Sequence, residues 1–329
     1  MDRFGRRIDY LRISVTDRCN LRCIYCMPPE GVPAKSHSEI LTLEEIARIA
    51  RAAAMCGMTR IRITGGEPLV RKGLTSLIRE LSAIHGIEDL ALTTNGMLLP
   101  AVARGLAESG LQRVNVSLDT LKRDRFRRIT RLGDVDGVLR GIDAAFEAGL
   151  RPVKLNVVAM RGWNEDEILD FARLTLERSL HVRFIELMPI GECLPWARRE
   201  LVPCQEIQER LRAFDPTFAP APAAHTARGG GPAVYYSFAG ALGTVGFIAA
   251  SSGHFCQSCN RLRLTADGRL GPCLFSMEGL DLRTLVRDRS VRDEDLCYAI
   301  RQAIDRKPPD RSVACALAPV GCGMSQIGG

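Results

Sequence analysis

Three cysteines stand close together near the start of the chain, at Cys19, Cys23 and Cys26. Three thiolates at the spacing Cys-x3-Cys-x2-Cys can ligate three irons of one cubane iron–sulfur cluster. The fourth iron then has no protein ligand, and an open coordination position is what a reaction at a metal centre needs. A structural zinc site is the alternative, because His37 could supply the fourth ligand that zinc requires.

A second group of three cysteines lies near the other end of the chain, at Cys256, Cys259 and Cys273. No fourth cysteine follows at a natural spacing, so this group also predicts an iron–sulfur centre with one open position. Zinc competes more strongly here, because His254 lies two residues before Cys256. Two groups of three cysteines in one chain favour iron–sulfur chemistry over zinc.

The first 190 residues alternate short β-branched runs with helical stretches, which predicts parallel strands joined by crossover helices. The predicted strands span residues 11–15, 60–64, 90–94, 113–119, 152–159 and 181–187. Thr42 and Glu45 form a predicted capping box for the helix after the first strand. Six units are too few for a closed eight-stranded barrel, so we expect an α/β fold with an open, partial (β/α)6 barrel of TIM type. Its site should lie at the carboxyl ends of the strands.

Polar residues alternate with apolar ones along the predicted strands. Arg12, Arg62, Asn115 and Lys154 each lie between aliphatic neighbours. Since helices are expected to cover the apolar side, the polar side should line a ligand site. A half-solvated antiparallel sheet would show the same alternation and is the alternative interpretation.

Composition predicts a globular protein of 329 residues, 46% of them hydrophobic. Neither an apolar run long enough to span a membrane nor a signal peptide is recognisable, so we expect a cytoplasmic location. In that compartment the 12 cysteines indicate metal sites or catalysis rather than disulfides. The net charge is +7, and only five of the 45 basic residues are lysines. Arginine suits bidentate binding of phosphate, although most of these residues are expected on solvated helix faces.

The first cysteine group resembles that of the radical S-adenosylmethionine (SAM) family. Tyr25 stands before the last cysteine as in that family, and a Gly-Gly-Glu segment follows the second strand at residues 65–67. The resemblance implies that the open iron of a 4Fe-4S cluster binds SAM and that reductive cleavage releases a 5′-deoxyadenosyl radical. The SAM contacts that it implies are Tyr25, Gly66, Ser117 and Met188.

Nearly the whole chain resembles the branch of this family that opens molybdenum cofactor biosynthesis. The shared features are the strand at residues 12–16, the second cysteine group and the terminal Gly328-Gly329. The resemblance implies a lyase with two 4Fe-4S clusters that cyclises GTP, joining ribose C3′ to guanine C8, with the guanine bound at the second cluster. The implied GTP contacts are Arg12, Arg62, Thr93, Lys154, Arg261 and Arg263, of which Arg261 and Arg263 are also predicted to be catalytic.

The same resemblance implies the partners and the organisation of the chain. It implies a low-potential electron donor, cyclic pyranopterin monophosphate synthase as the next enzyme and a homodimer, with no nucleic acid and no membrane. Residues 1–190 are expected to form the barrel with the first cluster, and residues 191–329 a C-terminal region with the second cluster and the Gly-Gly tail. The tail departs from the family: Lys307-Pro308 leads into the largely apolar residues 312–320, and Cys322 replaces an expected basic residue.

Two other functions are compatible with the cysteine groups. A radical SAM enzyme that matures peptides would also carry an auxiliary iron–sulfur cluster, usually with more cysteines in its C-terminal part. A noncatalytic iron–sulfur or zinc module would have every metal position filled by side chains.

Overall fold

The computed structural model describes residues 1–33, 35–222, 231–253, 255–275, 279–316 and 323–324. These residues form two compact units. Unit 1 comprises residues 1–93 and 105–112 together with the described part of 256–329, and unit 2 comprises 94–104 with the described part of 113–255. The predicted division of the chain after residue 190 remains a prediction.

Unit 1 is built on strands in the order β12-β11-β10-β1-β2-β3. Their bounds are β1 (Tyr10–Ser14), β2 (Arg60–Thr64), β3 (Asp89–Thr94), β10 (Arg261–Leu264), β11 (Arg269–Gly271) and β12 (Leu280–Asp281). β10, β1, β2 and β3 are parallel, whereas β11 and β12 pair antiparallel. Strand β10, which follows Cys256 and Cys259, therefore lies directly beside β1, the strand before the first cysteine group.

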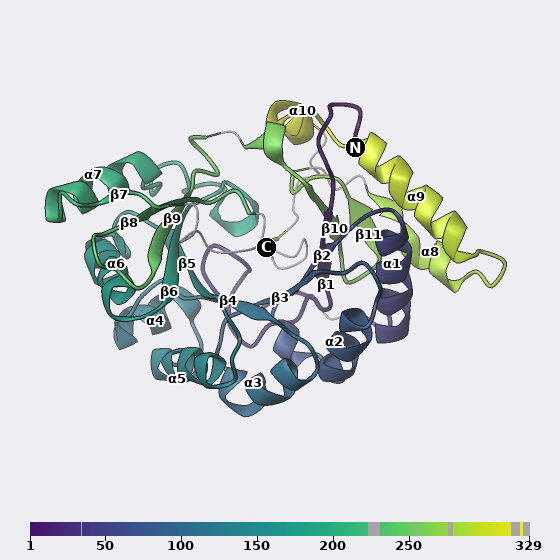
Figure 1. The fold of residues 1–329 in the computed structure, drawn as a ribbon, viewed down its shortest axis with the longest axis horizontal. Helices are drawn as coiled ribbons and strands as arrows, with labels where there is room; N and C mark the ends of the chain where they lie inside the picture. Colours follow the sequence, from purple (N-terminus) through teal and green to yellow (C-terminus); the bar gives the residue numbers. More distant parts are fainter. Residues whose placement is uncertain (34, 223–230, 254, 276–278, 317–322, 325–329) are drawn as a thin grey trace. The chain divides into compact units, whose positions relative to one another are not determined.

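Unit 1 also holds the helices that connect or follow these strands. They are α1 (Leu43–Met55), η1 (Pro68–Val70), α2 (Leu74–Ser82), η5 (Cys256–Ser258), α8 (Leu282–Arg287), α9 (Asp293–Asp305) and α10 (Arg311–Ala316). Figure 1 shows α1, α8 and α9 packed side by side. The predicted capping box of α1 is confirmed: the Thr42 hydroxyl accepts from Glu45 N and the Glu45 carboxylate accepts from Thr42 N. Its buried stripe includes Ile46, Ala47 and Ala50.

Unit 2 holds strands in the order β4-β5-β6-β9-β8-β7. The strands are β4 (Arg113–Ser117), β5 (Val153–Ala159), β6 (Leu180–Glu186), β7 (Ala219–Pro220), β8 (Val234–Ser237) and β9 (Thr244–Ile248). Its helices are α3 (Leu99–Glu108), which ends in unit 1, and α4 (Arg123–Thr130), α5 (Val135–Glu147), η2 (Glu165–Glu167), α6 (Ile168–Glu177), η3 (Gly191–Cys193) and α7 (Cys204–Phe214). β4, β5, β6 and β9 are parallel, and β8 and β7 pair antiparallel.

The parallel pairing decides between the two interpretations of the polar alternation. All six predicted strands exist within about two residues of their predicted bounds, and each pairing given above for β1 to β3 and β4 to β6 is parallel. The alternative of a half-solvated antiparallel sheet is therefore wrong. The polar residues are also buried: Lys154 and Asn115 are each 0% exposed.

No helix among the described residues is long and apolar enough to cross a bilayer.

Candidate functional site

The first cysteine group lies in the loop that follows β1. Cys19, Cys23 and Cys26 are all half-buried thiols. The loop turns tightly, with Cys26 N donating to Cys23 O at 2.9 Å. Leu21 N donates to the sulfur of Cys19 at 3.3 Å, and Arg22 Nη1 donates to Cys19 O at 2.6 Å. The backbone of this loop is thus held so that its sulfurs stay accessible.

The Gly-Gly-Glu segment after β2 packs against the residues that precede Cys19. Gly66 N donates to Thr16 O at 2.7 Å, and Glu67 N donates to Arg18 O at 2.8 Å. A Cβ at Gly66 would lie 2.3 Å from Arg18 O, so no side chain fits there. The loop of the predicted SAM contact Gly66 and the loop of the predicted cluster ligand Cys19 are therefore packed directly against each other in unit 1.

The second cysteine group also lies in unit 1, where two of its members precede β10 and the third follows β11. Cys256 begins η5, Cys259 N donates to Cys256 O at 3.2 Å, and Cys273 follows β11. All three thiols are half-buried. Burial works to raise the pKa of Cys259, but the charges of Arg261 and Lys307 outweigh it and lower the pKa to about 7. Its thiolate, the form that binds metals, is thus accessible near neutral pH.

The donor sets fit iron–sulfur clusters. Each group offers three reduced, half-buried sulfurs, and the first has a backbone amide directed at a sulfur, an interaction that such clusters use. Among the described residues, no three His, Cys, Asp or Glu side chains converge on a point that could hold a single metal ion. His254, the possible zinc ligand of the second group, lies outside the described residues.

A row of arginines crosses three neighbouring strands of unit 1. Arg12 on β1 is in register with Arg62 on β2 and with Arg263 on β10. Burial, and then the charges of Arg263 and Arg62, hold the pKa of Arg12 well below its ordinary value. Burial and Arg261 lower the pKa of Arg263 to about 10. Positive charge is thus concentrated in a desolvated place, where an anion would be strongly attracted.

The remaining predicted contacts divide between the units. Thr93 lies near the end of β3 in unit 1, and Tyr25 is half-buried within the first cysteine loop. Ser117 ends β4 in unit 2, where it is in register with Asn156 on β5. Lys154 on β5 is in register with Asn115 on β4, and Met188 follows β6 by two residues. Gly328 and Gly329 lie outside the described residues, as does Cys322.

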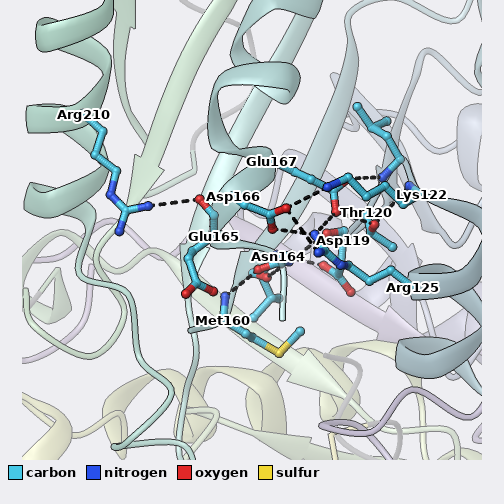
Figure 2. A network of polar contacts seen from close by, with 12 residues as sticks. Asp119, Thr120, Lys122, Arg125, Met160, Asn164, Glu165, Asp166, Glu167 and Arg210 are labelled. Atoms are coloured by element: carbon cyan, nitrogen blue, oxygen red, sulfur yellow. Dashed lines mark hydrogen bonds and ion pairs between the residues drawn. The ribbon is translucent and has the colours of Figure 1, made fainter. Parts of the chain in front are cut away.

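The turn after Ser117 is held by a buried polar network in unit 2 (Figure 2). Glu167, 0% exposed, accepts from Thr120 Oγ1 at 2.6 Å, from Leu121 N at 2.7 Å and from Arg125 Nη1 at 2.5 Å. Asn164 Nδ2 donates to Asp119 O at 2.7 Å. The end of β4 that carries the predicted SAM contact is therefore fixed from the segment that follows β5.

Sequence reasoning missed Arg183 as a candidate. It lies on β6 in register with Asn156, is 3% exposed and donates from Nη2 to Asn115 Oδ1 at 2.7 Å. The available signal was the alternation of His181 and Arg183 with Val182 and Phe184, which continues the polar face of β4 and β5 onto β6.

Comparisons with known proteins agree over the full length of the chain. Residues 13–175 match the family model described as "Radical SAM superfamily", and residues 180–313 match "Molybdenum Cofactor Synthesis C". A relative named GTP 3′,8-cyclase from Pelotomaculum thermopropionicum is 53% identical over 328 residues, which are 100% of this chain and 99% of that protein. Relatives of the same name from Heliobacterium modesticaldum and Moorella thermoacetica are each 52% identical, with 100% of this chain and 100% and 99% of those proteins covered.

Solved structures agree on the architecture. The crystal structure of Streptococcus suis SuiB bound to S-adenosylmethionine is similar with a TM-score of 0.58 at 16% identity, covering 87% of this chain and 67% of SuiB. SuiB bound to its precursor peptide SuiA gives the same TM-score and identity, covering 96% and 72%. At this identity the likeness concerns the fold alone. With the family match it confirms the predicted α/β class, an open partial barrel with a C-terminal extension.

Proposed function

We infer the function of this chain from one premise: it belongs to the GTP 3′,8-cyclase family of radical SAM enzymes. It is an enzyme of molybdenum cofactor biosynthesis, a lyase that converts GTP to 3′,8-cyclo-7,8-dihydroguanosine 5′-triphosphate. Its own residues must then bind a purine nucleoside triphosphate, hold SAM and keep both in fixed orientation.

The row of Arg12, Arg62 and Arg263 is the observation that best supports a triphosphate substrate. Arg12 lies between Arg62 and Arg263 on adjacent strands, and burial together with the charges of these two neighbours disfavours its charged form. A polyanion removes this cost and gains charge-assisted hydrogen bonds, which are roughly twice as strong as neutral ones. We assign Arg12, Arg62, Thr93, Lys154, Arg261 and Arg263 to GTP, with Arg261 and Arg263 also in the catalytic set.

The cysteine groups are assigned to two 4Fe-4S clusters. Cys19, Cys23 and Cys26 would hold the first, and Tyr25, Gly66, Ser117 and Met188 are assigned to SAM. Cys256, Cys259 and Cys273 would hold the second, whose open iron would take the guanine. When bound, SAM and the first cluster supply the one-electron chemistry that removes hydrogen from ribose C3′. The protein's part is to orient the ribose and to keep water away. The buried residues of β1, β2 and β10 are suited to both tasks.

The remaining assignments follow from family membership. We propose a cytoplasmic enzyme that takes electrons from a low-potential donor and passes its product to cyclic pyranopterin monophosphate synthase. A homodimer, without nucleic acid or membrane as partner, completes the proposal.

One experiment tests the substrate. The anaerobically reconstituted and reduced protein is incubated with SAM alone, with SAM and GTP, and with SAM and a cysteine-containing peptide. We expect 5′-deoxyadenosine together with a cyclic guanine nucleotide in the GTP reaction only. Absence of SAM cleavage in all three reactions would indicate a noncatalytic metal protein, and product formation from the peptide would indicate a maturase.

A further inference from the structure

Lys307 is a buried cation that the proposed reaction does not use. It follows the end of α9 and is 3% exposed. Its ammonium donates to Arg261 O at 2.9 Å and to Pro272 O at 2.6 Å. Arg261 lies two residues after Cys259, and Pro272 lies immediately before Cys273. One side chain thus ties together the two segments that carry these cysteines.

The charge of Lys307 is matched by thiols rather than by a carboxylate. The nearby thiols of Cys259 and Cys273 favour the charged form of the Lys307 ammonium, which burial alone would disfavour. In the described part of the chain, no Asp or Glu forms an ion pair with Lys307. An ammonium has three N–H donors. The carbonyl oxygens of Arg261 and Pro272 accept from two of them.

Arg6 connects the segment of Lys307 to Cys256, the remaining cysteine of the second group. Arg6 Nη1 donates to Cys256 O at 2.9 Å, and Arg6 Nη2 donates to Pro308 O at 2.8 Å. The charge of Arg6 is balanced within the buried pair that it makes with Asp2 at 2.6 Å. Arg6 therefore has a carboxylate partner for its charge, whereas the groups that favour the charge of Lys307 are the cysteine thiols.

We propose that Lys307 is a positioning residue for the second cluster: it fixes the segments of Cys259 and Cys273 and balances the charge of the bound centre. The proposal rests on the second cluster assigned above. Three thiolates give a 4Fe-4S centre net negative charge, and the potential of such a centre depends on charge and on hydrogen bonds to its sulfurs. Loss of the ammonium should therefore lower the midpoint potential of this centre and weaken its retention.

The test compares Lys307→Met with Lys122→Met, which removes an exposed lysine paired with Asp166 in unit 2. Iron and sulfide are counted in the full chain after anaerobic reconstitution. We expect about eight irons in the wild type and in the control, and between about four and eight in Lys307→Met, because its second site fills only in part. The midpoint of the second centre is then measured by potentiometry with Cys19, Cys23 and Cys26 all changed to Ala. We expect a more negative midpoint in Lys307→Met than in Lys122→Met.

Equal iron content and equal midpoints in the two variants would overturn the role of Lys307. A wild-type chain that binds only about four irons, all lost on changing the first cysteine group, would instead overturn the second cluster itself. If circular dichroism shows that cluster-free Lys307→Met does not fold, Lys307→Gln replaces it, because its amide keeps N–H donors without charge. Lys307→Gln should then retain iron at a lowered midpoint, and an unchanged midpoint would again overturn the proposal.

Discussion

Two adjacent carboxylates offer a sharp test of how unit 2 holds the end of β4. Glu167 and Asp166 both pair with Arg125 (Figure 2). The side chain of Glu167 is buried, whereas that of Asp166 is 53% exposed. Glu167 also accepts from Leu121 N and Thr120 Oγ1, which follow the predicted SAM contact Ser117. The perturbation is Glu167→Gln, with Asp166→Asn as the matched control.

The magnitudes differ because burial differs. In Glu167→Gln, one carboxylate oxygen becomes an NH2 group that faces a donor, so a buried N–H or O–H loses its acceptor. Such a loss costs about 1–3 kcal/mol, and a lost hydrogen bond between charged groups about 1.5–3 kcal/mol. Since Arg125 is partly exposed, we expect a total of about 3 kcal/mol for Glu167→Gln. Asp166→Asn removes only exposed ion pairs with Arg125 and Lys122, which contribute less than about 1 kcal/mol.

Urea unfolding of the cluster-free chain measures the difference. Both tryptophans, Trp163 and Trp196, lie in unit 2, so their fluorescence reports the unfolding of that unit. Glu167→Gln should lower the unfolding midpoint clearly, and SAM binding by the reconstituted variant should weaken with it. If the two variants unfold within about 0.5 kcal/mol of each other, the buried carboxylate does not hold the turn as argued.

Four further predictions concern the proposed site and its surroundings. Cys23→Ala should abolish 5′-deoxyadenosine formation, whereas Cys259→Ala should retain some SAM cleavage but lose GTP conversion; equal residual cyclisation in both would reject the assignment. Arg263→Ala should weaken GTP binding about tenfold or more by equilibrium dialysis, because it loses a charged hydrogen bond, while the exposed Arg51→Ala should not. Gly66→Ala should weaken SAM binding by displacing Arg18 O, and Gly105→Ala, which has open space, should leave it unchanged. Burial, Lys154 and Arg183 lower the pKa of His181 from 6.5 to about 4. Its stabilising contribution is therefore complete above pH 6.5 and is lost as the pH falls toward 4. The unfolding free energy of His181→Asn should decline less than that of the wild type between pH 6.5 and 4, and parallel pH profiles would contradict this.

The elements with strong local signals could be predicted from the sequence. The capping box at Thr42 depends on residues close together in the chain, and the helix α1 begins directly after it as expected. The alternation of Arg12, Arg62 and Lys154 with aliphatic residues gave the polar face, because a strand has a period of two whatever its partner. Strand partners could not be obtained in this way. The pairing of β1 with β10 joins segments about 250 residues apart, and no local pattern encodes it.

The pairing of β1 with β10 brings together residues that are far apart in the sequence. Taken alone, Arg12, Arg62 and Arg263 are ordinary basic residues in three strands. Parallel register places Arg12 between the other two, and burial then makes their repulsion costly. The same pairing anchors the second cysteine group beside the first strand, where Asn260 Nδ2 donates to Asp9 Oδ1 at 2.7 Å and Tyr10 N donates to Asn260 O at 3.2 Å. Burial of like charges on adjacent strands lowers the stability of the chain, and a bound anion would remove that cost.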